Sequence, residues 1–272
     1  MKVGVLLKQV PDTETPVRIN SEGTAVVEDD VKWIMNPYDE YAVEVGLRLK
    51  EKFGGDTVVA TMGDDSVVER MRTALAMGVD TGVHLNDAAF AGSDAMGEAK
   101  ALAAAIGKLD ADIILCGKQA IDWDMAQVPG MIAEAMDLPC VTACSALTVA
   151  DDGKSAAAKR KIEGAEETYE ISLPAVISID KGVVVQEGEP IQEARYASLP
   201  GIMKAKKKKV EVVGLGDTGL SADDVGAAGA KVKVTSYEAL PERAAGKVFA
   251  DGETEDMVKE VVKLLREEAK II

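Results

Sequence analysis

The chain has 272 residues, is 47% hydrophobic and has a mean hydropathy of +0.02, values typical of a globular protein with a substantial core. Its net charge of −16 at pH 7 argues against broad attraction to nucleic acid or to an anionic membrane surface. The single histidine, His84, sits in an apolar run that predicts a packed side chain. A single, packed histidine argues against a zinc site and against a histidine-based catalytic triad.

The N-terminal stretch and the cysteines are typical of a protein in a reducing compartment. The apolar stretch at the N-terminus is too short for a signal peptide, and no window reaches the length of a membrane span. Cys116, Cys140 and Cys144 are odd in number and lack metal-ligand spacing. We therefore expect buried, reduced thiols, a cytoplasmic location and no direct membrane insertion.

In chain order, strand-like apolar runs alternate with helical patterns through the first half of the chain. The runs are residues 3–7, 57–61, 82–85, 112–116 and 139–142. Helices are expected after an N-cap at Asn36, from a capping box at Ser66 and from Ser93, the last with Met96 facing inward. This alternation predicts a doubly wound, mostly parallel α/β sheet.

The pattern changes after residue 142. Runs with a period of two, 146–150, 156–162 and 167–173, are separated by turn residues and predict an antiparallel β-hairpin excursion. Residues 174–179 then read as a buried strand that returns to the main sheet.

The C-terminal part is poor in large apolar residues. Residues 214–230 read as a linker or extended arm, and a helix over 254–270 carries an apolar stripe that needs a surface to cover it. We expect an α/β domain over 1–210 that includes the hairpin, and an arm with a C-terminal helix over 211–272 that packs on a partner subunit.

The loop over residues 117–128 is crowded with polar groups and follows a predicted strand. Loops at the carboxyl ends of parallel strands line ligand crevices, and a following helix start attracts anions. These features favour nucleotide recognition, although Asp124 and Gln127 also fit the capping box of an ordinary helix. The chain has neither a G-x-G-x-x-G fingerprint after its first strand nor a phosphate-binding P-loop sequence.

Several segments occur in an order typical of one family. They are residues 36–40 (NPYDE), 72–78 (RTALAMG), 117–122 (GKQAID), 160–179 and 195–209 (RYASLPGIMKAKKKK). Over nearly its whole length the chain resembles the β subunit of electron transfer flavoprotein.

The resemblance implies an adenine-nucleotide-binding, Rossmann-like sheet in a heterodimer with an α subunit that holds most of an FAD. Such a protein is an electron carrier rather than an enzyme. It passes electrons from acyl-CoA-type dehydrogenases, as in fatty acid oxidation, to an acceptor such as a membrane quinone oxidoreductase. The β subunit would hold AMP, or a second FAD in electron-bifurcating members that oxidise NADH.

Two sets of residues carry over from the family. Apolar packing is expected from Leu6 and Met62, amide pairing from Asn36 and Gln119, and phosphate binding from backbone N–H groups around Ala126 to Val128. The cofactor-binding set is Leu6, Asn36, Pro37, Tyr38, Asp39, Met62, Gly117, Lys118, Gln119, Ala120, Ile121, Asp122, Trp123, Asp124, Met125, Ala126, Gln127 and Val128.

The second set would dock partner proteins. The resemblance makes Leu199 an exposed anchor for a dehydrogenase, whereas the residues alone favour a leucine packed on its own subunit. The lysines of 204–209 could steer acidic partners. The docking set is Tyr196, Leu199, Pro200, Ile202, Met203 and Lys204.

The chain departs from the family pattern at two places. Residues 177–191 are longer than the usual connection, which leaves the partner open. Trp123 replaces an acid and could stack on a ring or fill a gap. The run from Ala126 to Gly130 leans toward the bifurcating members but reverses their order of glycine and proline. A carrier with AMP, a bifurcating subunit with its own FAD, and a stand-alone adenine-nucleotide protein are the three hypotheses.

Overall fold

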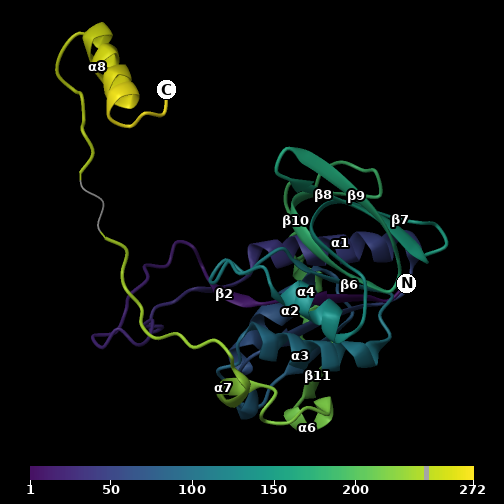
Figure 1. Cartoon of the computed structure of the whole chain (residues 1–272). Helices are drawn as coiled ribbons and strands as arrows, with labels where there is room; N and C mark the ends of the chain where they lie inside the picture. The colour runs from purple at the N-terminus through teal and green to yellow at the C-terminus, as the bar shows by residue number, and fades with distance from the viewer. Residues whose placement is uncertain (242–244) are drawn as a thin grey trace. The chain divides into compact units, whose positions relative to one another are not determined.

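The computed structural model describes residues 1–241 and 245–272, and the chain divides into two units. The larger unit comprises Met1–Val17 and Val27–Thr235, and the smaller comprises Arg18–Val26 and Ser236–Ile272. The larger unit contains the main sheet and its helices, and the smaller contains helix α8 (Thr254–Glu267) (Figure 1).

A sheet of nine strands, counted over the described residues, forms the centre of the larger unit, in the order β11-β5-β4-β1-β6-β10-β7-β8-β9. Pairing is parallel from β11 to β7 and antiparallel for β8 and β9. The predicted mostly parallel sheet with a hairpin excursion is thereby confirmed. The strands are β1 (Val3–Leu6), β4 (Thr57–Met62), β5 (Thr81–Leu85), β6 (Ile113–Gly117), β7 (Cys140–Val149), β8 (Ser155–Ile162), β9 (Ala165–Ser172), β10 (Ala175–Val185) and β11 (Val210–Val213). Outside this sheet, β2 (Gln9–Pro11) and β3 (Trp33–Met35) form an antiparallel pair.

Helices cover both faces of the sheet because the strands are apolar on both sides. Val3 and Val5 pack in one core cluster with α1 (Pro37–Phe53) and α2 (Val68–Met77). Leu6 points the other way and packs in a second cluster with α3 (Ala95–Ile106) and α4 (Val128–Ala135). This is the doubly wound arrangement that the sequence predicts.

The winding reverses at β1. From β1 the chain runs outward to β4 and β5, and it then returns to place β6 on the opposite side of β1. At such a reversal the connections after the two central strands diverge to opposite faces of the sheet, which leaves a crevice at the carboxyl ends of the strands.

Two helix starts differ from the predictions because an aspartate carboxylate binds a backbone N–H group at or just before each of them. The Asp64 carboxylate accepts from the N–H of Ser66 at 2.9 Å and begins the short 3-10 turn η1 (Asp65–Val67), so α2 begins at Val68 and not at Ser66. The Asp94 carboxylate accepts from Gly97 N at 3.0 Å, so α3 begins at Ala95 and not at Ser93.

Strand β7 joins two runs that were predicted separately, 139–142 and 146–150. Cys140, at its first position, is exposed, so the expectation that all three thiols are buried is wrong for this residue, while Cys116 and Cys144 are buried. His84 is buried as predicted, with Nε2 3.0 Å from the carbonyl oxygen of Gly63.

Residues 214–230 are not a free linker. They contain α6 (Leu215–Thr218) and α7 (Gly226–Gly229), and Val225 is fully buried in the cluster that includes α3. Close approach is possible because Gly226 has no side chain, since a Cβ there would lie 2.2 Å from the Ala89 carbonyl oxygen. The preceding segment, β11, pairs with β5 in the sheet, so the sheet extends past the expected boundary at residue 210.

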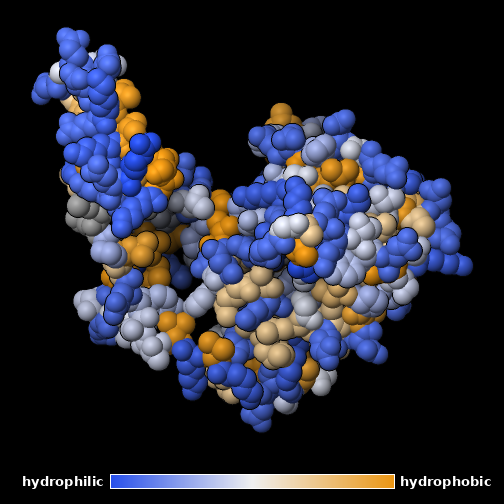
Figure 2. All heavy atoms as spheres, turned by 45° about the horizontal axis from the view of Figure 1, so that its top comes forward, coloured by the Kyte–Doolittle hydropathy of each residue, from blue (hydrophilic) through white to orange (hydrophobic). Residues whose placement is uncertain are grey.

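Helix α8 forms where a helix was predicted, and the apolar residues Val258, Val261 and Val262 are exposed on it. Figure 2 shows hydrophobic atoms along one side of this helix. No residue of α8 is buried in the described chain. Among residues 1–241 and 245–272, no helix combines the length and apolar character needed to cross a membrane.

Candidate functional site

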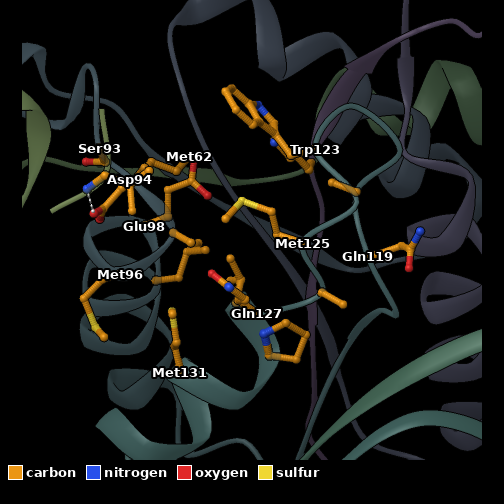
Figure 3. Close-up of a pocket in the computed structure, with 18 of the residues that line it drawn as sticks. Met62, Ser93, Asp94, Met96, Glu98, Gln119, Trp123, Met125, Gln127 and Met131 are labelled. Atoms are coloured by element: carbon orange, nitrogen blue, oxygen red, sulfur yellow. Dashed lines mark hydrogen bonds between the residues drawn. The ribbon is translucent and has the colours of Figure 1, made fainter. Parts of the chain in front are cut away.

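A pocket of about 780 Å³ opens at the carboxyl ends of β1, β4 and β6, at the reversal of the winding, and lies within the larger unit (Figure 3). Its volume falls in the range of roughly 300–1,000 Å³ that holds small ligands and cofactors. Twelve residues of the predicted cofactor set line it: Leu6, Asn36, Asp39, Met62, Gly117, Gln119, Ala120, Trp123, Met125, Ala126, Gln127 and Val128.

The rest of that set, namely Pro37, Tyr38, Lys118, Ile121, Asp122 and Asp124, is not part of the pocket lining. Several of these residues shape the loop instead. Asp122 pairs with Lys8 at 2.8 Å, and Lys118 pairs with Asp180 at 3.1 Å.

The sequence interpretation missed two walls of the pocket. One is the start of α3, where Met96 is 43% exposed and lines the pocket rather than the core. The other is the chain after α7, from Ala230 to Val234. The sequence could have indicated the α3 wall, since the predicted helix leads into β6 and covers the face of the sheet at the crevice. No motif or periodicity in residues 230–234 indicates that they line a pocket.

A single carboxylate holds those two walls together. Asp94 Oδ1 accepts from Gly97 N of α3, while Oδ2 accepts from Lys231 N at 2.6 Å and Val232 N at 3.1 Å. Burial would raise the pKa of Asp94, but these N–H donors together lower it. The negative charge at the start of α3 therefore fixes the position of a distant segment.

A second carboxylate, that of Asp39, joins the ends of the central strands. Its Oδ2 accepts from Lys8 N at 2.7 Å, just after β1, and its Oδ1 accepts from Gly117 N at 2.9 Å, at the end of β6. Burial raises the pKa of Asp39 to about 7, against the lowering effect of these N–H groups. The contact requires glycine at 117, because a Cβ there would lie 2.3 Å from Asp39 Oδ1.

The Asn36 carboxamide anchors the loop that follows β6. Its Nδ2 donates to the Gln119 carbonyl at 2.9 Å, and its Oδ1 accepts from Ile121 N at 3.3 Å. Asn36 therefore does not cap α1 through its side chain, and within the described residues no other side chain does. The Asn36 carboxamide, which was expected to pair with a purine edge, instead bonds to the backbone of the loop.

The end of the loop presents backbone donors. Asp124 accepts from Gln119 Nε2 at 2.6 Å, so the alternative in which Asp124 and Gln127 form a capping box does not hold, and α4 begins at Val128. Asp124 and Ala126 have positive φ values, 50° and 53°. The N–H groups of Ala126, Gln127 and Val128 donate no hydrogen bond to any described residue. Pro129 has no N–H to add to this row of donors.

The family "Electron transfer flavoprotein domain" matches residues 23–218. The chain is 38% identical to the electron transfer flavoprotein subunit beta of Bacillus subtilis (strain 168), over 100% of both chains. It is also 38% identical to the Homo sapiens protein of that name, over 98% of both chains. The chain belongs to the electron transfer flavoprotein β-subunit family.

The segment that the sequence predicts to dock partner proteins is exposed. Leu199 is 79% exposed, Tyr196 86% and Met203 73%, so the alternative that Leu199 packs on its own subunit does not hold. The remaining residues of this set, Pro200, Ile202 and Lys204, are also exposed, and Leu199 begins the short helix α5 (Leu199–Ala205).

The backbone of that segment is fixed at both ends. On one side, Arg195 Nε lies 2.7 Å from Glu44 Oε2; burial would raise the pKa of Glu44, but Arg195 and Arg48 lower it. On the other side, Arg72 donates to the Ala205 and Lys208 carbonyls. Lys208 Nζ in turn donates to the Leu75 and Val79 carbonyls near the end of α2, so this lysine is structural while its neighbours Lys206 and Lys207 are exposed.

Gly117→Ala is expected to destabilise the chain by at least about 2 kcal/mol, since the new methyl group displaces the Asp39 carboxylate and leaves buried N–H groups unpaired. The measurement is urea denaturation of the purified protein. Gly130→Ala is the matched control because a Cβ there meets nothing within 4 Å. Equal stability of the two variants would contradict the role of Asp39.

Asp39 also predicts a pH dependence. Its pKa is about 7 in the folded chain against 3.8 for the free side chain, so the folded state binds more protons between these values. The free energy of unfolding should therefore fall as pH rises through this interval, by up to about 1.4 kcal/mol per pH unit. Denaturation series at several pH values would measure it. Asp39→Asn, which does not titrate, should be less stable throughout but show a flatter slope, and an unchanged slope would refute the assignment.

Proposed function

We propose that this chain is the β subunit of a heterodimeric electron carrier and that its pocket holds the AMP moiety of an adenine nucleotide. The observation that carries the proposal is the row of N–H groups at Ala126, Gln127 and Val128, which find no acceptor in the described part of the chain and lie in the pocket wall at the start of α4. Such a row binds a phosphate without a basic side chain. Leu6, Met62 and Leu102 supply apolar surface for the base.

The chain offers no organised set of catalytic acid, base and nucleophile among the described residues. Redox chemistry in this proposal belongs to an FAD held mainly by an α subunit, and the β subunit contributes position and surroundings. Electrons would come from dehydrogenases of the acyl-CoA type and pass to an acceptor such as a quinone oxidoreductase.

Contact with the α subunit is assigned to α8. Its valines are exposed in a helix that buries none of its residues in the described chain, and a stripe of this kind is stabilised by a partner surface.

Contact with the dehydrogenase is assigned to the segment 196–204. Lys204, Lys206 and Lys207 are exposed beside it and would steer acidic partners at low ionic strength.

One observation favours the bifurcating alternative, in which the pocket holds a second FAD and NADH is oxidised. Trp123 lines the pocket yet is 52% exposed, so its ring is available to stack on a further ring system.

The cofactor content of the complex tests the proposal. Coexpression with the α subunit should give a heterodimer that releases one FAD and one AMP, measured by absorbance and chromatography after denaturation. Two FAD with no AMP would replace the carrier function with the bifurcating one. Failure to form a heterodimer, or a complex without adenine nucleotide, would contradict the proposal.

Leu199→Ala should lower kcat/KM for reduction by the partner dehydrogenase about 10-fold or more, because burial of a leucine side chain contributes about 1.5–3 kcal/mol. FAD and nucleotide content should not change. Val212→Ala is the control, since Val212 is 62% exposed on β11 outside the segment. Equal rates for both variants would remove Leu199 from the docking surface.

A further inference from the structure

Three acidic side chains line the pocket, and the carboxylates of two of them accept hydrogen bonds from backbone N–H groups of the protein. Asp39 accepts from two backbone N–H groups, and Asp94 accepts from three. Glu98 makes no hydrogen bond or ion pair through its side chain with any residue in the described part of the chain. It is the carboxylate that remains available to a ligand.

Glu98 lies in the first turn of α3, and Figure 3 shows its side chain projecting from that helix into the hollow. It is only partly exposed, and burial raises its pKa, with Lys8 acting in the opposite direction. The Lys8 ammonium pairs with Asp122 at 2.8 Å. A partly desolvated carboxylate without a donor lowers the stability of the empty protein, as is common for groups that serve a ligand.

The chemistry of a carboxylate restricts the group that it can bind. It accepts hydrogen bonds and repels phosphate, which in the proposed function lies against the N–H groups of Ala126 to Val128. No group of three or more metal-ligating side chains occurs among the described residues, so a metal bridge is not supported. Between the phosphate and the base of a nucleotide lies the ribose, whose two adjacent hydroxyls are donors that an acidic side chain can accept.

We propose that Glu98 accepts hydrogen bonds from the ribose hydroxyls of the bound nucleotide and makes the pocket selective for ribonucleotides. This assignment rests on the proposed nucleotide site. It applies equally to AMP and to FAD, because both contain the adenosine ribose.

The test uses the heterodimer after removal of its nucleotide, titrated in a calorimeter with AMP, 2′-deoxy-AMP and IMP. The wild-type complex should bind AMP about 10- to 100-fold more tightly than 2′-deoxy-AMP, the range for a hydrogen bond to a charged group. Glu98→Met, which keeps the volume and removes the acceptor, should abolish this preference. Glu98→Gln, which keeps one neutral acceptor, should weaken it.

A second readout separates a ligand role from a structural one. Without nucleotide, both Glu98 variants should melt at the same temperature as the wild type or higher, since they remove an unpaired charge from a partly buried position. Glu134→Gln is the control, because Glu134 is an exposed carboxylate on α4 outside the pocket. It should leave affinity and preference unchanged.

The outcomes distinguish the two levels of the proposal. If the wild type binds AMP and Glu98→Met keeps the AMP preference over 2′-deoxy-AMP, the assignment of Glu98 is overturned and the nucleotide site stands. If Glu98→Met loses the preference for AMP over IMP instead, the carboxylate binds the adenine amino group and the ribose assignment is overturned. If the wild type binds none of the three nucleotides, both proposals fail.

Discussion

Two backbone N–H groups from distant parts of the chain meet on the carboxylate of Asp39. One follows β1 and the other ends β6, the two strands between which the winding of the sheet reverses. Asp39 lies in the first turn of α1, and the N–H groups that donate to its carboxylate oppose the effect of burial on its pKa. The geometry of the crevice depends on this contact, since both loops that flank it leave from the residues that Asp39 holds. The contact is possible because residue 117 is a glycine, since a Cβ there would collide with the Asp39 carboxylate.

The polar side chains of the loop after β6 serve mainly to fold that loop. Asn36, Asp122 and Asp124 were natural candidates for ligand contacts because carboxylates and amides bind nucleotides. In the folded chain they bond to Gln119, Ile121 and Lys8. In the proposed function, ligand recognition is left to groups that composition does not reveal, namely the backbone N–H groups at residues 126–128, the apolar walls and Glu98.

The sheet could be predicted because its signal is local. Apolar runs of four or five residues, separated by helical periodicity and turn residues, are sufficient to specify parallel strands covered on both faces. The helix starts at Val68 and Ala95 were missed because an aspartate competed with the predicted cap. The pocket wall at 230–234 was missed for a different reason. It is positioned by one carboxylate, Asp94, which lies more than a hundred residues earlier in the chain, and no periodicity records such a contact.

The two exposed apolar surfaces differ in how the chain supports them. The segment 196–204 lies on the larger unit and is held by Arg195 at one end and Arg72 at the other, with Gly201 so close to α2 that a Cβ would lie 2.3 Å from the Ala76 carbonyl oxygen. Such a surface loses little conformational entropy on binding, which suits brief encounters that must be specific and then dissociate. Helix α8 belongs to the smaller unit and buries none of its residues in the described chain. Because an amphipathic helix gains most of its stability from a covered apolar face, α8 is suited to a permanent neighbour rather than a transient one. The difference in support is consistent with the proposed function, in which the segment 196–204 meets a transient partner and α8 meets a subunit that stays bound.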